Sequence, residues 1–434
     1  MPVAQKQQKS EILGSFDTQI DAYLTILQSK SSTDSDIKNT LVSILALIKD
    51  HYSDISEQKM NQIYKTIGTD IVGNTALSKD TRQQSFNVLF QIFKKNSYSF
   101  DDMVSDTRAF VNVMFSIAGN KSEDLAMRTN SYTALQVVIT SGAMVGSQTH
   151  YDIFNFSENA AKNADSLPIA QNSLSVIALL FAKPSFGPFM DQAHYERAID
   201  LAASMYDSNP MQEGLYSFYA SLLQEIMIAS NDYLTVPIEI SNPYLKRALN
   251  LGYELATKTQ LQESQIDTLG YFAADLIDSQ KQNIEADDIG LALSIEEILQ
   301  GVSAYPNNIL CQIGRIMESG VESGKVDCQT PCIASEIEKM FDWFSKSSID
   351  NDKYSAIYFI KCTVFADSSS VTSHYSDIMQ RADQCMTKMA DDDPDKHLVG
   401  RLMSLICFKA TDYLKMPKYS QMLMLDSATA EGIL

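Results

Sequence analysis

The sequence predicts an all-α fold, and two observations support that prediction. First, the chain of 434 residues contains only 17 Gly and 11 Pro, whereas an all-β fold needs a turn about every ten residues and draws on Gly and Pro to make it. Second, apolar residues recur at the spacing of one helical face over long stretches. Because 45% of the residues are hydrophobic, the chain has enough apolar side chains to bury a core.

Residues 34–117 show this periodicity most clearly, and they predict four consecutive amphipathic helices of about twenty residues each. The four apolar stripes are Ile37, Leu41, Ile44, Leu45 and Ile48; Met60, Ile63, Ile67 and Ile71; Phe86, Leu89, Phe90 and Phe93; and Phe110, Val113, Met114 and Ile117. A polar break at Ser53–Ser56 separates the first two helices. Asp34 or Asp36 is expected to cap the first helix, because a carboxylate there accepts hydrogen bonds from the unpaired N–H groups of the first turn.

Helices are also expected on both sides of this stretch, separated by Gly, Pro or polar residues. The expected ranges are Ser10–Gln28, Glu123–Thr140, His150–Ala164, Ile169–Ala182, Met190–Tyr206, Pro210–Ala229, Pro243–Thr257, Glu263–Ser279, Asp287–Leu299, Ile309–Glu322, Pro331–Phe344, Tyr354–Phe365, Val371–Ala390 and Pro394–Leu414. In the second half, a capping residue precedes a proline at several starts, and Pro is tolerated at the first helical position because its missing N–H would be unpaired there. These dipeptides are Asn209-Pro210, Asn242-Pro243, Thr330-Pro331 and Asp393-Pro394.

The strongest interruption in the first half is the turn Lys183-Pro-Ser-Phe-Gly-Pro188. Pro and Gly together mark a turn or loop, so we expect a boundary there. The predicted organisation is a disordered tail over residues 1–9, an N-terminal helical repeat region over residues 10–183 and a C-terminal helical repeat region over residues 189–434.

The expected helix starts recur about every twenty to twenty-two residues, so helix pairs recur about every forty, which is the length of the two-helix repeats in HEAT and armadillo proteins. In period, length and loop brevity the chain resembles a HEAT/armadillo-like α-solenoid. The tetratricopeptide pattern and the ankyrin Thr-Pro-Leu-His motif are absent from the sequence. The resemblance implies stacked antiparallel helix pairs that offer an extended surface to protein partners.

The net charge of −20 argues against nucleic-acid binding, because an acidic surface repels phosphates. An acidic surface attracts basic segments of protein partners, and it also keeps many proteins soluble. The N-terminus shows no signal-peptide core, and no apolar run approaches the eighteen residues of a membrane span. We therefore expect a cytoplasmic protein with no membrane insertion, or an extracellular one if Met1 is an artificial start.

All six cysteines lie in the last third of the chain: Cys311, Cys328, Cys332, Cys362, Cys385 and Cys407. In a reducing compartment they would be core thiols. In an oxidising compartment, an even number confined to one region would form local disulfides. Two glycosylation sequons, at Asn120 and Asn155, are compatible with the second interpretation.

No motif in the sequence predicts catalysis or a cofactor. The five histidines form no H-x-x-x-H pair, and Cys328 and Cys332 lack the second cysteine pair that structural zinc usually needs. The acidic runs Asp391–Asp395 and Asp287-Asp288 lack the spacing of a calcium-binding EF-hand loop. Glycine-rich phosphate loops and the G-x-S-x-G elbow of hydrolases are also absent. We therefore predict no catalytic, cofactor-binding or metal-ligating residue.

Phe181, Phe186 and Phe189 form an aromatic cluster around the Pro-Gly turn. They could make an exposed edge for a partner, or the loop could fold back on the core. The predicted function is a non-enzymatic scaffold, adaptor or assembly factor that binds proteins through a helical-repeat surface. Two alternatives stay open: a helical segment of a large extracellular or membrane-tethered protein with disulfides in its last third, and an all-α enzyme of unrecognised type.

Overall fold

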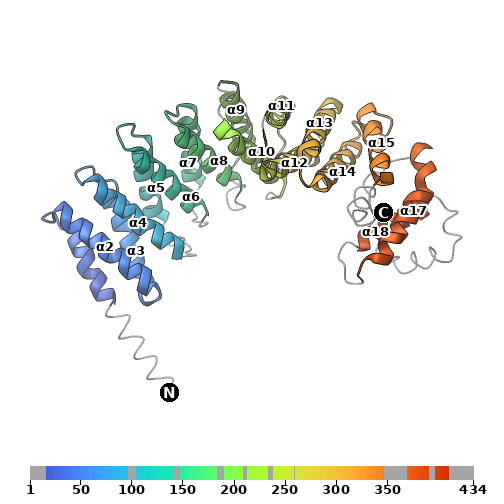
Figure 1. The fold of residues 1–434 in the computed structure, drawn as a ribbon. Helices are drawn as coiled ribbons and strands as arrows, with labels where there is room; N and C mark the ends of the chain where they lie inside the picture. The colour runs from blue at the N-terminus through green and yellow to red at the C-terminus, as the bar shows by residue number, and fades with distance from the viewer. Residues whose placement is uncertain are drawn as a thin grey trace, which may run out of the picture. The chain divides into compact units, whose positions relative to one another are not determined.

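The computed structural model describes residues 16–95, 104–140, 147–182, 190–208, 213–232, 238–258, 260–346, 369–390 and 396–409. All regular secondary structure within these residues is helical (Figure 1), so the predicted all-α fold is confirmed. The chain forms two compact units, Met1–Met190 (unit 1) and Asp191–Leu434 (unit 2). The predicted tail over residues 1–9 and the predicted boundary at residues 183–188 lie outside the described residues.

Unit 1 contains a first helix over residues 16–28 and then the helices expected from the sequence. They are α2 (Asp34–His51), the 3₁₀ turn η1 (Tyr52–Asp54), α3 (Glu57–Lys65), the π-helical turn η2 (Thr66–Ile71), α4 (Lys79–Lys95), α5 (Val104–Gly119), α6 (Leu125–Thr140), α7 (Ser147–Lys162) and α8 (Leu167–Phe181). The four helices predicted within residues 34–117 are confirmed as α2, α3 with η2, α4 and α5.

The helices of unit 1 pack in two layers. The even-numbered layer is α2, α4, α6 and α8, in which each helix packs on the next, and the other layer is α3 with η2, then α5 and α7. Consecutive helices such as α5 and α6 pack across the two layers as antiparallel pairs. The even-numbered helices begin at residues 34, 79, 125 and 167, so the repeat lengths are 45, 46 and 42 residues. The repeat is therefore somewhat longer than the forty residues expected from the sequence.

The N-cap of α2 is Thr33, so the prediction of a cap at Asp34 or Asp36 is wrong. The Thr33 hydroxyl accepts a hydrogen bond from the Asp36 N–H at 3.2 Å, and the Asp36 carboxylate accepts one from the Thr33 N–H at 2.9 Å. This reciprocal capping box satisfies two backbone donors at once. Asp34 instead accepts a hydrogen bond from the Ser78 N–H at 2.8 Å, just before α4.

Two buried arginines join neighbouring repeats of unit 1 in the same way. Each donates from Nε to a carbonyl at the C-terminal end of the preceding helix, and from a terminal nitrogen to a carboxylate in the loop before the next even-numbered helix. The two sets are Arg82 with Val72 (2.9 Å) and Glu123 (2.8 Å), and Arg128 with Ala118 (3.1 Å) and Asp165 (2.8 Å). Arg82 and Arg128 lie 46 positions apart, so this contact, which we call the arginine clasp, follows the repeat.

The packing of α5 on η2 requires a glycine at position 68. A Cβ on Gly68 would lie 2.7 Å from Cδ2 of Phe110, which is closer than packed carbon atoms approach. Phe110 is fully buried, and its ring also contacts those of Tyr64 and Phe93 at centroid distances of 5.2 and 6.3 Å. The apolar stripes that the sequence shows on α4 and α5 therefore meet in one aromatic cluster.

Unit 2 continues the same element pattern. Its helices are α9 (Gln192–Ser208), the 3₁₀ turn η5 (Glu213–Leu215), α10 (Tyr216–Asp232), α11 (Asn242–Lys258), α12 (Glu263–Ser279), α13 (Ala286–Val302), α14 (Pro306–Glu322), α15 (Pro331–Lys346), α17 (Ser369–Lys388) and α18 (Lys396–Lys409). The predicted start at Pro331 is confirmed. Pro210 and the predicted helix Tyr354–Phe365 lie outside the described residues.

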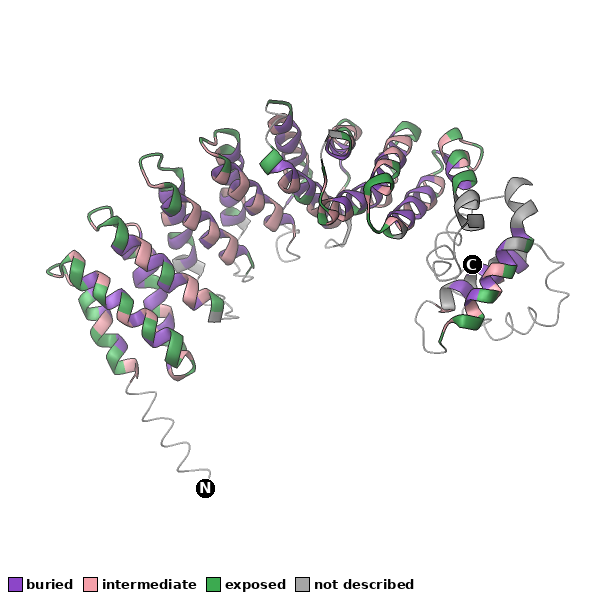
Figure 2. Ribbon diagram, viewed as in Figure 1, coloured by how far each residue is buried: buried purple, intermediate pink, exposed green. Residues whose placement is uncertain are grey.

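The helices of unit 2 also form two layers. The layer of α10, α12 and α14 packs on the layer of α9, α11, α13 and α15, and α17 packs on α18. Buried residues lie along the helix faces that meet neighbouring helices, and exposed residues gather on the outer faces and at the turns (Figure 2). In the described part of the chain, no helix is both long and apolar enough to cross a membrane.

Candidate functional site

The start of α11 is fixed between its two neighbours in the layer. The Ser241 N–H donates a hydrogen bond to the Glu196 carboxylate of α9 at 3.0 Å. The Asn242 side-chain amide donates to the Asn283 carbonyl and to the Asp288 carboxylate of α13, both at 2.8 Å. These bonds hold α11 against α9 on one side and α13 on the other, so the surface between α9 and α11 has a defined shape. The predicted helix start at Asn242-Pro243 is confirmed.

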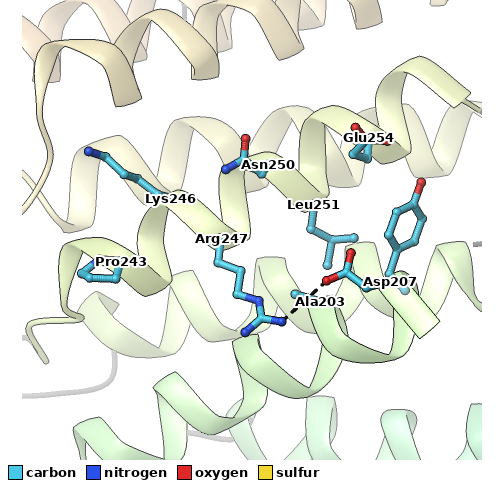
Figure 3. Close-up of a pocket in the computed structure, with 9 residues that line it drawn as sticks. Ala203, Asp207, Pro243, Lys246, Arg247, Asn250, Leu251 and Glu254 are labelled. Carbon is cyan, nitrogen blue, oxygen red and sulfur yellow. Dashed lines mark ion pairs between the residues drawn. The ribbon is translucent and has the colours of Figure 1, made fainter. Parts of the chain in front are cut away.

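A cavity of about 260 Å³ lies in the groove between α9 and α11 (Figure 3). Its lining residues are Ala203, Tyr206 and Asp207 of α9 and Pro243, Lys246, Arg247, Asn250, Leu251 and Glu254 of α11. Those of α11 recur every three or four positions, which places them on one face of the helix. Ala203 and Leu251 are buried and form an apolar floor, whereas the rim is polar and charged. We call this feature the α9–α11 groove.

Arg247 lies over α9 in the middle of the groove. Its guanidinium pairs with the Asp200 carboxylate, donates to the Ser204 hydroxyl at 3.1 Å and approaches the Asp207 carboxylate at 3.6 Å. The three partners are spaced along one face of α9, so a single planar side chain spans two turns of that helix. Asp207 stays 71% exposed beside this cation, and it therefore presents its carboxylate to solvent at the groove.

Lys246 lies at one end of the groove and pairs with Glu285, which precedes α13, at 2.9 Å. The hydrogen bond with Glu285 raises the pKa of Lys246, and the nearby Asp288 acts in the same direction. The same contact lowers the pKa of Glu285. Both groups are therefore charged at neutral pH, and the Lys246 side chain is 40% exposed.

The charges of the α9–α11 groove are arranged along its length. Lys246 lies at one end, Asp207 and Glu254 lie at the other, and Arg247 and Leu251 lie between them (Figure 3). Lys246 and Glu254 are eight residues apart on α11, which corresponds to about 12 Å along the helix axis. The lining contains no Ser, Thr, Cys or His, so its chemistry is that of hydrogen bonding and ion pairing. Both cations of the groove are already paired with carboxylates of the chain, Lys246 with Glu285 and Arg247 with Asp200.

Across the described residues, no group of three or more His, Cys, Asp or Glu side chains is placed to hold a metal ion. Five of the six cysteines lie among these residues. Cys385 and Cys407 are buried, whereas Cys311, Cys328 and Cys332 are half-buried. Burial raises the pKa of the Cys332 and Cys407 thiols. Cys362 lies outside the described residues, and the disulfide hypothesis stays a prediction.

The three phenylalanines of the predicted aromatic cluster are described only in part. Phe181 is fully buried at the end of α8, and its ring packs edge-to-face on Phe154 at a centroid distance of 6.3 Å. That side chain belongs to the core of unit 1. Phe186 and Phe189 lie outside the described residues, so an aromatic edge for a partner stays a prediction.

The acidity of the chain is concentrated in unit 2. Residues 1–190 carry 16 basic and 18 acidic side chains, and residues 191–434 carry 18 basic and 36 acidic ones, so the net charges are −2 and −18. The layer of α10, α12 and α14 holds eight Asp or Glu residues and one basic residue, Arg315. Arg315 pairs with Asp275 at 2.6 Å and Asp278 at 3.6 Å. The overall charge of −20 did not reveal this asymmetry, but counting the two halves of the sequence separately would have done so.

Sequence reasoning also missed the α9–α11 groove. Lys246 and Arg247 are the only two adjacent Lys or Arg residues in the sequence of residues 191–434, and that was the signal available. The acidic partners of Arg247, which are Asp200 and Asp207, lie on another helix, 47 and 40 positions away. Only the packing of α9 on α11 brings these three residues together.

Comparisons with known proteins show which solved structures have a similar fold. No protein-family model and no curated protein matches the chain. The solved Kap95:Nup1 complex matches with a TM-score of 0.54 at 10% identity, over 98% of this chain and 61% of that one. Two further structures also match. Kap121p bound to Pho4p has a TM-score of 0.41 at 12% identity, over 98% of this chain and 49% of that one. Importin beta has a TM-score of 0.35 at 11% identity, over 93% of this chain and 59% of that one. The chain thus spans about three fifths or less of these proteins' lengths.

The likeness to Kap95, whose score exceeds 0.5, agrees with the packing of helix pairs in both units. These neighbours are HEAT-repeat solenoids. The chain is therefore an α-solenoid of stacked antiparallel helix pairs, and the predicted HEAT/armadillo-like architecture is confirmed. At 10% identity the likeness concerns the fold alone.

Proposed function

We propose that the chain is a non-enzymatic protein-binding scaffold, an adaptor or assembly factor that acts in the cytoplasm and binds basic segments of its partners through unit 2. The observation that carries this proposal is the net charge of −18 over residues 191–434, against −2 over residues 1–190. A surface with one dominant sign of charge steers partners of the opposite sign and excludes those of the same sign.

The architecture supports a binding role. Stacked helix pairs contact mainly their sequence neighbours, so the outer faces of both layers stay available along the stack. Kap95, which has a similar fold, was solved as a complex with Nup1. Fold similarity does not determine function, so this parallel supports protein binding in general and no particular partner.

The test is affinity capture of the intact chain from a lysate of its native cells, with mass spectrometry of the proteins that co-purify. We expect a stoichiometric partner that contains a basic segment. The capture is repeated with Asp267→Lys and Glu338→Lys together, because both side chains belong to unit 2 and neither lines the α9–α11 groove. This double variant should lose most of the partner.

A matched control keeps the change in charge and moves it to unit 1. Asp50→Lys with Asp70→Lys alters the net charge by the same amount at two exposed positions. Equal loss of the partner by both double variants would show that only the total charge matters and would contradict a binding role for unit 2. An empty capture, with the chain running as a monomer, would contradict the scaffold function itself.

A further inference from the structure

Two buried glutamates lie where α13 packs on its neighbours: Glu296 of α13 itself, on the side of α12 and α14, and Glu336 of α15. We propose that α13 is a pH-sensitive joint, whose packing on α12, α14 and α15 is strongest when Glu296 and Glu336 are protonated. A rise in pH then opens these contacts locally while the rest of the chain stays folded. This inference goes beyond the proposed protein-binding function and does not depend on it.

Glu296 lies where ionisation is costly. The side chain is fully buried, and neither carboxyl oxygen has a hydrogen-bond partner among the described residues. A Cβ on Gly270 of α12 would lie 3.1 Å from Oε2 of Glu296 and 3.4 Å from Cδ1 of Ile309 on α14, so the carboxyl group occupies the space that this glycine leaves between the helices. A carboxylate without water or a partner is expensive to bury. The packed chain therefore favours the neutral form.

The charged groups of α12 and α14 do not compensate for this cost. Burial raises the pKa of Glu296 well above its ordinary value, and Arg315 of α14 lowers it by less. Arg315 is the only basic residue in the sequences of α12 and α14. Its guanidinium is already paired with Asp275 of α12 at 2.6 Å and lies 3.6 Å from Asp278. The other charged residues of α12, Glu263 and Asp267, are acidic.

The cations of the other two helices that pack on α13 are also paired with carboxylates. On α11, Lys246 pairs with Glu285, which precedes α13, at 2.9 Å, and Arg247 pairs with carboxylates of α9. On α15, Lys339 pairs with Glu297 of α13. An ionised Glu296 would therefore have to compete for a cation that already has a partner, or reach water by separating α13 from α12.

Glu336 shows a similar situation at the contact of α13 with α15. Its side chain is 5% exposed, and burial raises its pKa to about 7. It accepts a hydrogen bond from the Lys339 ammonium at 2.8 Å, and the same ammonium pairs with Glu297 of α13. Burial raises the pKa of the nearby Cys332 thiol, which therefore stays neutral. One cation thus serves two carboxylates, so ionisation of Glu336 leaves an excess negative charge at this contact.

Ionisation of either carboxyl group favours an open state in which that group reaches water. In the open state the pKa is the ordinary 4.5, and in the packed state it is higher. The free energy of opening is therefore largest below pH 4.5 and falls as the pH rises toward the packed-state pKa. For Glu336 this fall ends at about pH 7. Because stacked helix pairs contact mainly their sequence neighbours, these helices can open while unit 1 stays packed.

The test is hydrogen exchange of the intact chain, followed by mass spectrometry at a series of pH values from about pH 5 to about pH 9, which measures opening segment by segment. The rates are corrected for the intrinsic effect of pH on exchange. In residues 263–346, which contain α12 to α15, the open population should rise by up to tenfold for each pH unit and each carboxyl group. In residues 104–140 of unit 1 it should change much less.

Neutral variants of nearly the same size separate the two carboxyl groups. Glu296→Gln should remove most of the pH dependence in α12, α13 and α14, and Glu336→Gln should remove it in α15. Glu338→Gln is the matched control, because it removes one negative charge at an exposed position of α15, and it should exchange like the wild type at every pH. Thermal unfolding of each variant shows that the fold is intact.

A second measurement detects the proton itself. Infrared difference spectra of the wild type against Glu296→Gln at neutral pH should show the band of a protonated carboxyl group, and a carboxylate band in its place would overturn the inference. The same pH dependence of exchange in the wild type and in Glu296→Gln combined with Glu336→Gln would also overturn it, as would an equally large change in residues 104–140. None of these measurements involves a partner, so an empty capture and a failure of the joint are distinguishable.

Discussion

Glu296 on α13 is the least favourably placed ionisable side chain that the structure describes in unit 2. It is fully buried, and neither carboxylate oxygen has a hydrogen-bond partner among the described residues. A Cβ on Gly270 of α12 would lie 3.1 Å from its Oε2, so a glycine at that position leaves room for the carboxyl group. Burial raises the pKa of Glu296 well above its ordinary value, although Arg315 acts in the opposite direction. Glu336 on α15 shows the same effect, because burial raises its pKa to about 7.

Glu296→Gln should make the stability of the chain less sensitive to pH. The folded-state pKa of Glu296 lies above its ordinary value of 4.5. Its contribution to the stability of the fold is therefore fully present below pH 4.5 and is lost as the pH rises toward the folded-state pKa. Between these two pH values, the free energy of unfolding of the Gln variant should rise relative to that of the wild type by up to about 1.4 kcal/mol for each pH unit. Urea unfolding at several pH values above 4.5 measures the difference.

Glu338→Gln, at an exposed position of α15, controls for the loss of one negative charge. Its stability should follow the wild type at every pH. If the Glu296→Gln and wild-type curves ran parallel between pH 4.5 and pH 8, the carboxyl group would be ionised in the folded chain, and the description of its environment would be wrong.

At the scale of the element, the helices of unit 1 are held in register by polar contacts as well as by apolar stripes. The arginine clasp joins three parts of the chain: the end of one helix, the body of the next, and the loop that follows in the neighbouring repeat. Arg128 is 7% exposed, so its guanidinium is bonded where water cannot replace the lost contacts. Buried polar groups of this kind are costly to leave unpaired.

Arg128→Ala should destabilise unit 1 by about 2–3 kcal/mol, because it leaves the Ala118 carbonyl without this donor and removes the partner of the partly buried Asp165. Arg108→Ala is the matched comparison. Arg108 is 56% exposed and lies 3.8 Å from Asp152, so its loss should cost less than about 1 kcal/mol. Thermal or urea unfolding of the two variants measures both values, and equal costs would contradict the structural role of the clasp.

The individual elements show which features the sequence could predict and which it could not. Helices such as α2 and α5 were predictable because their apolar residues repeat within one segment, which is a local property. The cap of α2 was predicted at Asp34 or Asp36, whereas Thr33 is the N-cap and Asp36 completes the capping box from the third helical position. The ion pairs of the arginine clasp and the contacts of the α9–α11 groove could not be predicted, because they join residues about 40 positions apart and no local spacing records such a contact.

At the scale of the whole molecule, charge is the property that differs most between residues 1–190 and residues 191–434. The two segments have the same helical architecture, with net charges of −2 and −18. Self-repulsion in a strongly acidic segment lowers stability, so this excess of charge is unfavourable for folding alone. The proposed basic partner would relieve part of this repulsion.

Binding of the captured partner should therefore depend strongly on salt. Raising the ionic strength from about 0.1 M to about 1 M shortens the Debye length from about 10 Å to about 3 Å, which screens exposed charges from one another. We expect most of the partner to be released over this range, and faster association at the low-salt end. Surface plasmon resonance at a series of salt concentrations measures both rates. A partner held mainly by apolar contacts would stay bound throughout.

The arginine clasp also determines how the chain could be shortened or extended by design. Each clasp takes its carbonyl from one repeat and its carboxylate from the next, so no single repeat of unit 1 contains a complete one. Removing a whole period of 46 residues, from Val72 to Ile117, would bring the Ala118 carbonyl and Arg128 into the positions that Val72 and Arg82 now occupy. Removing one helix alone would leave a buried guanidinium facing the wrong partner. The interchangeable module of unit 1 is therefore the segment from one clasp to the next, and not the helix.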